Sequence, residues 1–430
     1  MHSDNLKGYK QTEIGEIPEE WGVRELDDIC EEITDGSHGS PKEDKNGEYR
    51  IASVVNIVDN QIDIDSCKRI SRSDYDFIVR NGCKPQIGDI LFSKDGTVGL
   101  SFNFKQDARI VLLSSIAIIR PKKVLDSDFG AFLLKSPFVL RKITSSKRGT
   151  GLKRIIVRDL KRLQLPLPPL PEQRKIAEVL STVDEAIQKV DEAIAKTERL
   201  KKGLMQRLLT KGIGHTKFKF SEELGCKIPE EWEVRKLGGL TKVMVGYVGP
   251  ITEFYTIDGD SIPLLSTTNI SEDGLKLENP KYVTLEFHSK NKKSQVFPGD
   301  IIIARHGSSG SATVIPIKLK EAHCLNVVIV RRSEIVKSEF ICYLFNLKSV
   351  RDRLIGWKSG SVQGVVNTKV LENFNIPLPP LHEQKKITEI LSIVDEKTSI
   401  EKRKRERLER VKKGLMNDLL TGKKRVKLNE

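Results

Sequence analysis

The sequence predicts a mixed α/β protein in which two globular domains are separated by two long helices packed as an antiparallel coiled coil. The first observation is an internal repeat, because residues 166–184 read PLPPLPEQRKIAEVLSTVD and residues 377–395 read PLPPLHEQKKITEILSIVD. The second is the spacing of apolar residues after each proline cluster, which alternates between four and three as in a coiled-coil seam. The third is the set of short β-branched runs between the repeats, which is typical of strands.

The repeat extends along the whole chain in one register. The offset of 211 residues, from Pro166 to Pro377, also relates three shorter pairs of blocks. These are IPEEWGVREL (17–26) and IPEEWEVRKL (228–237), GDI (88–90) and GDI (299–301), and KKGLM (201–205) and KKGLM (412–416). Matched blocks in one register indicate a tandem duplication. We therefore expect globular domains at 1–165 and 213–376, proline connectors with long helices at 166–212 and 377–430, and pseudo-twofold symmetry between the halves.

Each long helix follows a proline connector. Four prolines between 166 and 171 fix φ and remove backbone donors, which predicts a stiff, extended segment over 164–170. Pro171 and Glu172 suit a first helical turn. The pattern predicts helices over about 171–210 and 383–420, with Leu200 and Val411 also in the apolar stripe and a polar interruption at 401–407. The predicted core of the helix pair is Ile176, Leu180, Val183, Ile187, Val190, Ile194, Leu204, Leu208, Ile387, Leu391, Val394, Leu408, Leu415 and Leu419.

The globular domains alternate apolar runs with turn residues. Runs at 51–58, 62–64, 88–93 and 110–120 in the first half, and at 262–266, 300–304 and 326–331 in the second, predict strands. Residues 129–143 predict a helix that Pro137 kinks or splits, and residues 340–355 predict its counterpart. The segments 31–84 and 241–295 scarcely align, which fits either two different recognition tasks or drift in surface loops.

Composition points to a polyanionic partner. Lys and Arg outnumber Asp and Glu by 73 to 59, a formal net charge of +14, and the last 35 residues are strongly basic. A solvated basic helix face would produce the same tail. The six cysteines have no CxxC pair or zinc-like spacing, there is no signal-peptide pattern, and no apolar run approaches the roughly 20 residues of a membrane span. We expect a cytoplasmic protein that binds no metal and no membrane.

No catalytic signature is present in the sequence, which contains neither a GxxxxGK[ST] phosphate loop nor a GxGxxG motif after a strand. The turns at 94–99 and 305–310 follow equivalent strands, and the loops 35–42, 147–154 and 358–363 combine glycine with cations, hydroxyls or amides. Each is explained either as an ordinary turn or as a DNA-contacting loop, with Lys94 and Arg305 aimed outward. The candidate DNA-binding residues are Ser37, His38, Lys42, Lys94, Thr97, Arg148, Thr150, Lys153, Arg154, Tyr247, Arg305, His306, Ser308, Ser309, Lys358, Ser361 and Gln363.

The doubled IPEEW, GDI[LI] and PLPPLxEQ blocks resemble the specificity subunit of type I restriction–modification enzymes, over essentially the whole chain. The resemblance implies two target recognition domains that each read one half of a bipartite double-stranded DNA target, held apart by the helix pair. It implies a non-catalytic chain whose helices set the spacing between the half-sites and dock methyltransferase subunits, with a restriction subunit as a further partner. S-adenosylmethionine, ATP and Mg would be bound by those partners. His382 departs from the pattern, because it replaces the proline that matches Pro171.

Three alternatives remain open at this point. The chain could serve an adenine methyltransferase that has no nuclease, it could be a self-contained enzyme acting on nucleic acid, or it could be a coiled-coil scaffold that binds only protein. Turnover by the pure chain would favour the enzyme, and binding that ignores DNA sequence would favour the scaffold.

Overall fold

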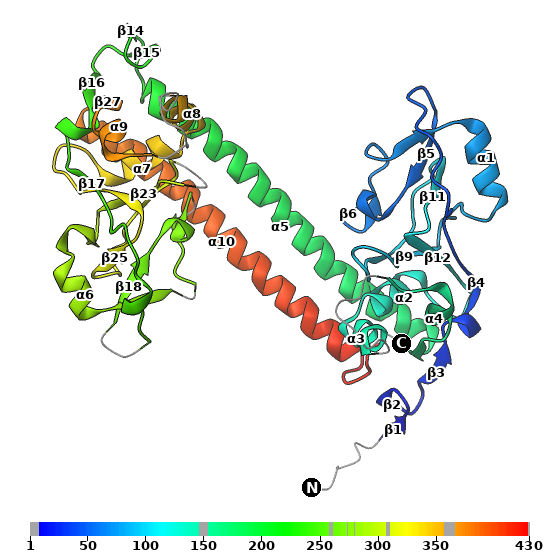
Figure 1. The fold of residues 1–430 in the computed structure, drawn as a ribbon. Helices are drawn as coiled ribbons and strands as arrows, with labels where there is room; N and C mark the ends of the chain where they lie inside the picture. Colours follow the sequence, from blue (N-terminus) through cyan, green and yellow to red (C-terminus); the bar gives the residue numbers. More distant parts are fainter. Residues whose placement is uncertain are drawn as a thin grey trace. The chain divides into compact units, whose positions relative to one another are not determined.

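The structure is a computed structural model that describes residues 8–145, 154–257, 261–272, 274–278, 280–306, 310–356 and 366–428. The chain forms two compact units, Met1–Asp191 with Lys404–Glu430 and Glu192–Arg403. Each unit combines one globular part with a stretch of both long helices, α5 (Leu170–Lys211) and α10 (Leu381–Leu419) (Figure 1). Both long helices therefore contribute residues to each unit.

Unit 1 contains an antiparallel sheet in the order β10-β9-β12-β4 and a second sheet in the order β11-β5-β8, in which β11 and β5 are parallel. The strands of these sheets are β4 (Cys30–Asp35), β5 (Tyr49–Ala52), β8 (Lys68–Ile70), β9 (Ile90–Ser93), β10 (Ser101–Asn103), β11 (Ile110–Leu112) and β12 (Ile116–Pro121). Two-stranded pairs join β1 (Tyr9–Thr12) to β2 (Gly15–Pro18), β3 (Gly22–Glu25) to β13 (Gln164–Leu167), and β6 (Ile57–Val58) to β7 (Gln61–Ile62). The short helices are α1 (Arg72–Arg80), α2 (Ser127–Leu134), α3 (Pro137–Ser145) and α4 (Val157–Lys161).

Unit 2 repeats this plan with sheets in the orders β17-β26-β23-β24 and β21-β18-β25-β22, the second again containing one parallel pair, β18 with β25. The strands are β17 (Val243–Val245), β18 (Ser261–Leu265), β21 (Lys281–Thr284), β22 (Gln295–Val296), β23 (Ile301–Ala304), β24 (Ala312–Val314), β25 (Ala322–Cys324) and β26 (Val327–Val330). Pairs join β14 (Phe218–Ser221) to β15 (Cys226–Pro229), β16 (Glu233–Lys236) to β27 (Asn375–Leu378), and β19 (Ile270–Ser271) to β20 (Gly274–Leu275). The short helices are α6 (Leu285–Lys290), α7 (Ser338–Asn346), α8 (Lys348–Gly356) and α9 (Thr368–Glu372).

The segments that scarcely align in sequence nevertheless fold alike. A single-turn helix follows β5 in unit 1 and β18 in unit 2. The same capping box stabilises its N-terminus in both units, formed by Ser53 with Asn56 and by Ser266 with Asn269. In each case the asparagine Oδ1 accepts the serine backbone N–H at 2.9 Å. A local hydrogen-bond pattern therefore survives where the surrounding side chains differ.

Several sequence expectations are confirmed and others need correction. Pro137 does begin a second helix, but the helix expected over 340–355 is also split, into α7 and α8. The run at 51–58 is interrupted by the single-turn helix, and the run at 110–120 divides into β11 and β12. The expected extended conformation is confirmed at the start of each proline connector, where the first residues pair as strands β13 and β27 with β3 and β16.

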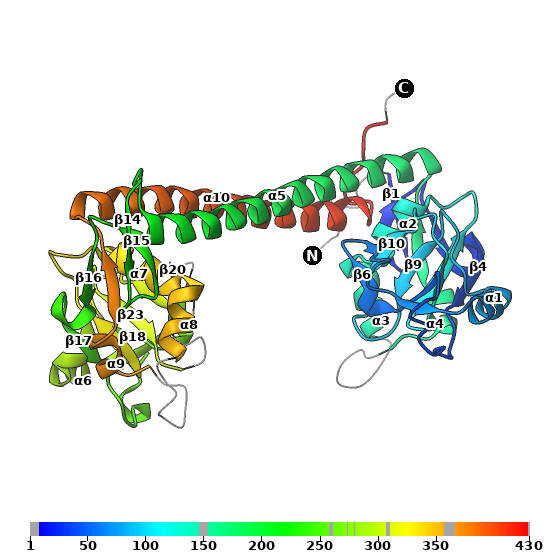
Figure 2. The ribbon, with the colours of Figure 1, turned by 90° about the horizontal axis from the view of Figure 1, so that it is seen from above.

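The long helices lie side by side and run in opposite directions within each unit (Figures 1 and 2). In unit 1, Lys412 of α10 pairs with Asp184 of α5 at 2.5 Å, and in unit 2 the repeat-related Lys201 of α5 pairs with Asp395 of α10 at 2.5 Å. All the predicted core positions of the helix pair are buried or half-buried. Leu200 and Val411 are the exceptions to the predicted stripe, because they are 53% and 51% exposed.

The repeated IPEEW and PLPPLxEQ blocks meet in space. The indole Nε1 of Trp21 donates to the buried Glu172 carboxylate at 2.9 Å, and Trp232 donates to Glu383 at the same distance. The neighbouring Gln173 donates from its amide to two backbone carbonyls and accepts the N–H of Asp126 at 2.8 Å. These contacts fasten the first turn of each long helix to its globular part.

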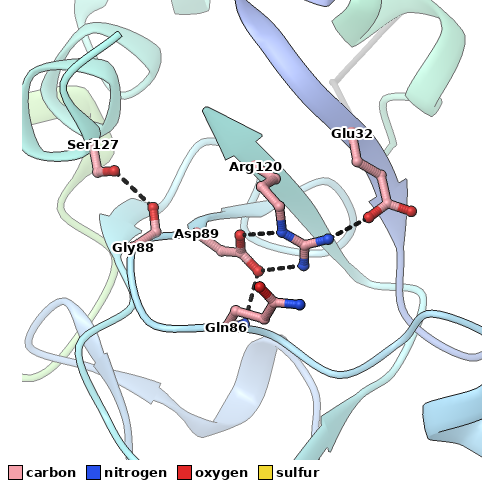
Figure 3. A network of polar contacts seen from close by, with 6 residues as sticks. All are labelled: Glu32, Gln86, Gly88, Asp89, Arg120 and Ser127. Carbon is pink, nitrogen blue, oxygen red and sulfur yellow. Dashed lines mark hydrogen bonds and ion pairs between the residues drawn. The ribbon is translucent and has the colours of Figure 1, made fainter. Parts of the chain in front are cut away.

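The aspartate of the GDI block in unit 1 holds neighbouring strands together through an ion pair with an arginine, which we call the clamp (Figure 3). The buried Asp89 carboxylate accepts both Nε and Nη2 of Arg120 at 3.0 Å and the backbone N–H of Gln86 at 2.8 Å. Arg120 lies on β12 and also donates to Glu32 of β4, so the clamp joins three neighbouring strands. In unit 2 the repeat-related Asp300 pairs with Nη1 of Arg331 and accepts the backbone N–H groups of Phe297 and Arg332.

Replacing the buried carboxylate should destabilise unit 1 strongly. In Asp89→Ala the half-buried Arg120 loses its bidentate partner, and we expect unfolding to become easier by about 3 kcal/mol. Differential scanning calorimetry would measure this as a transition lowered by several degrees. Glu48→Ala, which removes an exposed pair with Arg109, is the control and should change the unfolding free energy by less than about 1 kcal/mol. Equal effects of the two variants would contradict the assignment.

Candidate nucleic-acid interface

Two of the predicted DNA-contacting segments, and the last residue of a third, converge at one end of the four-stranded sheet of unit 1. The loop 36–42 follows β4 and the turn 94–99 follows β9, and both strands pair with the same end of β12. Arg154 is the last residue of the third predicted segment, and its neighbour Ile155 donates its N–H to the Lys94 carbonyl at 2.8 Å. We call these segments the strand-end loops of unit 1.

Unit 2 has an equivalent set of strand-end loops. The loop 246–250 follows β17 and the turn beginning at Arg305 follows β23, and β17 and β23 both pair with β26. Val366, which follows the third predicted segment in the sequence, donates its N–H to the Arg305 carbonyl at 3.2 Å. The loops therefore occupy the same position in the fold but carry different side chains.

A glycine turns the chain into the first of these loops in both units. A side chain at Gly36 would place its Cβ 2.3 Å from the Leu112 carbonyl oxygen, and one at Gly246 would lie 2.7 Å from that of Cys324. This close approach lets the next residue hydrogen-bond to the parallel strand, with Ser37 N–H to Leu112 O at 2.7 Å and Tyr247 N–H to Cys324 O at 2.8 Å. The loop is thus anchored at its first residue.

Lys94 does not point outward, as the sequence suggested. Its side chain is buried and its Nζ lies 2.7 Å from Oδ2 of Asp35, the last residue of β4. The other carboxylate oxygen of Asp35 lies 3.5 Å from Nε2 of the exposed His38. The charge of Lys94 is satisfied inside the unit because a buried ammonium without an anion would be costly, so Lys94 positions the loop.

Arg305 is also turned inward, and its role parallels that of Lys94. The half-buried guanidinium donates from Nη1 to Asn326 Oδ1 at 2.8 Å and from Nε to the Val366 carbonyl at 3.3 Å. Asn326 has a left-handed backbone (φ 54°) and donates its own N–H to the Tyr247 carbonyl at 2.9 Å. Arg305 and Asn326 together connect the three strand-end loops of unit 2.

Other predicted residues are accessible. His38, Lys42, Thr97, Arg154 and His306 are exposed and Ser37 is half-buried. Arg154 lies 3.6 Å from Asp95, and Tyr247 is half-buried with its ring edge-on to Phe287 at 4.9 Å between centroids. The predicted residues Arg148, Thr150, Lys153, Ser308, Ser309, Lys358, Ser361 and Gln363 lie outside the described residues.

The sequence did not predict the residues that line the hollow beside the loop 36–42 or those that hold the loops in position. Beside the loop 36–42 lies a hollow of about 520 Å³ that is also lined by Asp74, Phe77 and Asn81 of the α1 region. Phe77 is 63% exposed. Asp35 and Asn326 gave no usable signal, because their roles depend on strands that pair only in the folded chain. In the part of the chain described here, no cluster of His, Cys, Asp and Glu could hold a metal ion.

Comparison with known proteins finds the same domain twice in this chain. The model of the type I restriction modification DNA specificity domain matches residues 18–197 and 229–410. The putative type I restriction enzyme MjaX specificity subunit of Methanocaldococcus jannaschii is 34% identical, over 98% of this chain and 97% of its own. The EcoKI specificity subunit of Escherichia coli is 23% identical, over 80% and 72%.

Solved structures show a similar fold at low sequence identity. One from a study of complex assembly and conformational transition of the type I R-M system has a TM-score of 0.58 and 19% identity, covering 94% of this chain and 99% of that one. The S subunit of a type I restriction–modification system from M. genitalium has a TM-score of 0.56 and 17% identity, covering 93% and 96%. Within the described residues, no helix has the length and apolar character to cross a membrane.

A buried histidine pair distinguishes unit 2 from unit 1. His323 of β25 and His288 of α6 approach with their Nδ1 atoms 3.3 Å apart, and His288 Nε2 lies 3.3 Å from Glu321. If His288 donates to Glu321, His323 must donate to His288, which leaves His323 Nε2 unprotonated and without a partner among the described atoms. Burial, together with the His288 ring, lowers the pKa of His323 to about 4. The equivalent residue of unit 1 is the apolar Val111.

Unit 2 should lose stability as the solution is acidified, and unit 1 should do so less. The unfolded chain binds a proton at His323 near pH 6.5, but the folded chain does so only near pH 4. The free energy of unfolding should therefore fall between these values, by up to about 3 kcal/mol. Hydrogen exchange at β25 would measure this, with β11 as the internal control. His323→Val should remove the pH dependence, and an unchanged profile in that variant would contradict the assignment.

Proposed function

Because the chain belongs to the type I restriction modification DNA specificity family, we propose that it is the subunit that selects the DNA sequence for a type I restriction–modification complex. The observation that carries this proposal is the pair of strand-end loop sets, which share one place in the fold and differ in chemistry. Unit 1 presents His38 and Lys42, whereas unit 2 presents Tyr247 and His306. Each set would read one half of a bipartite double-stranded target.

The charge of the chain supports DNA as the ligand. The net charge of +14 favours a polyanion. Imidazole, hydroxyl and ammonium groups on glycine-rich loops can contact both phosphates and base edges. Lys94 and Arg305 would act indirectly, by holding these loops in position.

The long helices would set the distance between the half-sites. A helix of 42 residues such as α5 is roughly 63 Å long, under two turns of DNA at about 34–36 Å each. Its ion pairs and apolar contacts with α10 would keep that distance fixed. The base pairs between the half-sites would then go unread.

Catalysis would belong to partner proteins. Methyltransferase subunits would bring S-adenosylmethionine and a restriction subunit would bring ATP and Mg, while this chain remains non-catalytic and cytoplasmic. The absence of a phosphate loop or dinucleotide motif from the sequence supports this division of roles.

The function can be tested on the host genome. Methylation-sensitive sequencing with and without this gene should show the loss of one gapped, two-part methyladenine motif. Restoring the gene should restore the motif. In a strain whose partner methyltransferase is expressed, a methylome that does not change with the gene would contradict the proposal.

Single substitutions should separate the two half-sites. His38→Ala should relax the sequence requirement of one half-site only, by about 1 kcal/mol at one base pair if the imidazole reads a base. His306→Ala should affect the other half-site, so each variant is the control for the other. The measurement is methylation of target libraries randomised in each half. Weakening that is uniform across sequences and reduces the salt dependence would indicate phosphate contact instead, and effects of both variants on the same half-site would contradict the division between units.

A further inference from the structure

The hollow beside the first strand-end loop of unit 1 lies between that loop and helix α1. Its volume is about 520 Å³, and residues 36–41 form its loop wall. Asp74, Phe77 and Asn81 form the opposite wall, and their spacings of three and four residues place them on one face of α1 and its C-cap. We call this space the α1 hollow. It continues the candidate nucleic-acid interface, because the loop belongs to both.

The side chain of Phe77 is 63% exposed, although it is large and apolar. The apolar side of α1 is formed by other residues, since Tyr75 and Ile78 are buried. Packing within unit 1 therefore gives no reason for an aromatic residue at position 77. An exposed phenyl ring beside a hollow offers an apolar contact to a ligand.

Unit 2 places aromatic rings of its own at the corresponding position. Helices α1 and α6 correspond, because α1 follows β8, which pairs with β5, and α6 follows β21, which pairs with β18. Ser37 and Tyr247 correspond as well, since each donates its backbone N–H to the parallel strand. The ring of Tyr247 lies edge-on to Phe287 of α6, whereas the small side chain of Ser37 leaves the α1 hollow open.

The charges around the α1 hollow favour the edge of a base over a phosphate. Among the described residues that line it, none is Lys or Arg, and two carry carboxylates, Asp35 and Asp74. Asp35 is paired with Lys94, but Asp74 accepts only a neutral side-chain donor, the Ser71 hydroxyl, at 2.7 Å. These carboxylates repel a phosphate, whereas an amino group of a base can donate to them. In the major groove, only adenine and cytosine present such an amino group.

We infer that Phe77 and Asn81 read one A·T base pair in the half-site that unit 1 selects. This inference rests on the proposed function and adds to it a base pair and the two residues that read it. The Phe77 ring contacts the 5-methyl group, which thymine alone carries among the four bases, and the Asn81 amide pairs with N6 and N7 of adenine. Asp74 disfavours guanine, which presents only the acceptors O6 and N7 in the major groove.

The test uses the full chain in complex with the methyltransferase subunit of the same system, and target duplexes in which one thymine at a time is replaced by deoxyuridine. This replacement removes only the 5-methyl group. At one position of one half-site it should weaken binding about 4-fold, the effect of withdrawing one methyl-sized group from an apolar contact. Phe77→Ala should abolish this difference, and Phe77→Leu, which keeps an apolar contact, should retain most of it. Fluorescence anisotropy would measure the affinities.

Asn81→Ala should act at the same base pair through adenine. In duplex libraries randomised over both half-sites, it should relax the selection for A·T at that position roughly 10-fold and leave the deoxyuridine effect in place. The matched control is Phe220→Ala, which removes an equally exposed phenyl ring (63%) from β14 of unit 2. It should change neither measurement.

Three results would overturn the inference. The first is wild-type binding that is indifferent to deoxyuridine at every thymine of both half-sites. The second is an effect of Phe77→Ala or Asn81→Ala on a G·C pair, or a weakening that is equal for all sequences. The third is a loss of methyltransferase binding by Phe77→Ala with the base preference intact, which would mean that the ring meets a protein.

The wild-type complex separates this inference from the proposed function. If it selects a bipartite sequence but does not distinguish thymine from deoxyuridine, only the reading by Phe77 and Asn81 is wrong. If it selects no sequence at all, the proposed function is wrong as well.

Discussion

The organisation of each unit depends on one buried carboxylate in the first turn of a long helix. Glu172 accepts the Trp21 indole and the Arg425 guanidinium, and Glu383 accepts the Trp232 indole, the Ile213 N–H and the His215 ring. A desolvated carboxylate needs these donors. It therefore joins the segment that enters the globular part, the helix that leaves it, and the segment that follows the other long helix. The side chain that contacts the carboxylate from the segment after the other long helix differs between the units, Arg425 in one and His215 in the other, but the connection is the same.

Beyond the contacts of this carboxylate, the two units share the same arrangement of strands but differ in their loops. A buried aspartate of the repeated GDI block pairs with an arginine in both units, Asp89 with Arg120 and Asp300 with Arg331, although only the first pair is bidentate. At the loops themselves the chemistry changes, from the Lys94–Asp35 ion pair in unit 1 to the Arg305–Asn326 hydrogen bond in unit 2. A rigid frame with variable loops is a general way to change recognition without disturbing the fold.

The sequence predicted the repeated plan well because its signals are local or periodic. The bounds of α5 and α10 follow from prolines and apolar spacing, and Pro137 marks the break between α2 and α3. The errors arose where a residue's environment is set by distant chain. Lys94 looked like an outward cation until the end of β4 brought Asp35 to it, and Leu200 fitted the periodic stripe but lies outside the buried face. The apolar spacing predicts the helix and its apolar side. Which residues at the edge of that side are buried depends on the surface that packs against the helix.

The sequence by itself determined the duplication, the order of globular part and long helix, the apolar seam and the lack of a catalytic motif, since each can be read from residue types at fixed spacing. Only the tertiary structure decided what the repeated blocks do. Trp21 meets Glu172 across 151 residues, and the loops after β4 and β9 come together because both strands pair with β12. Strand pairing brings together loops that are remote in sequence, and this determines where the candidate interface lies. Packing and charge determine that the side chains of Lys94 and Arg305 point inward.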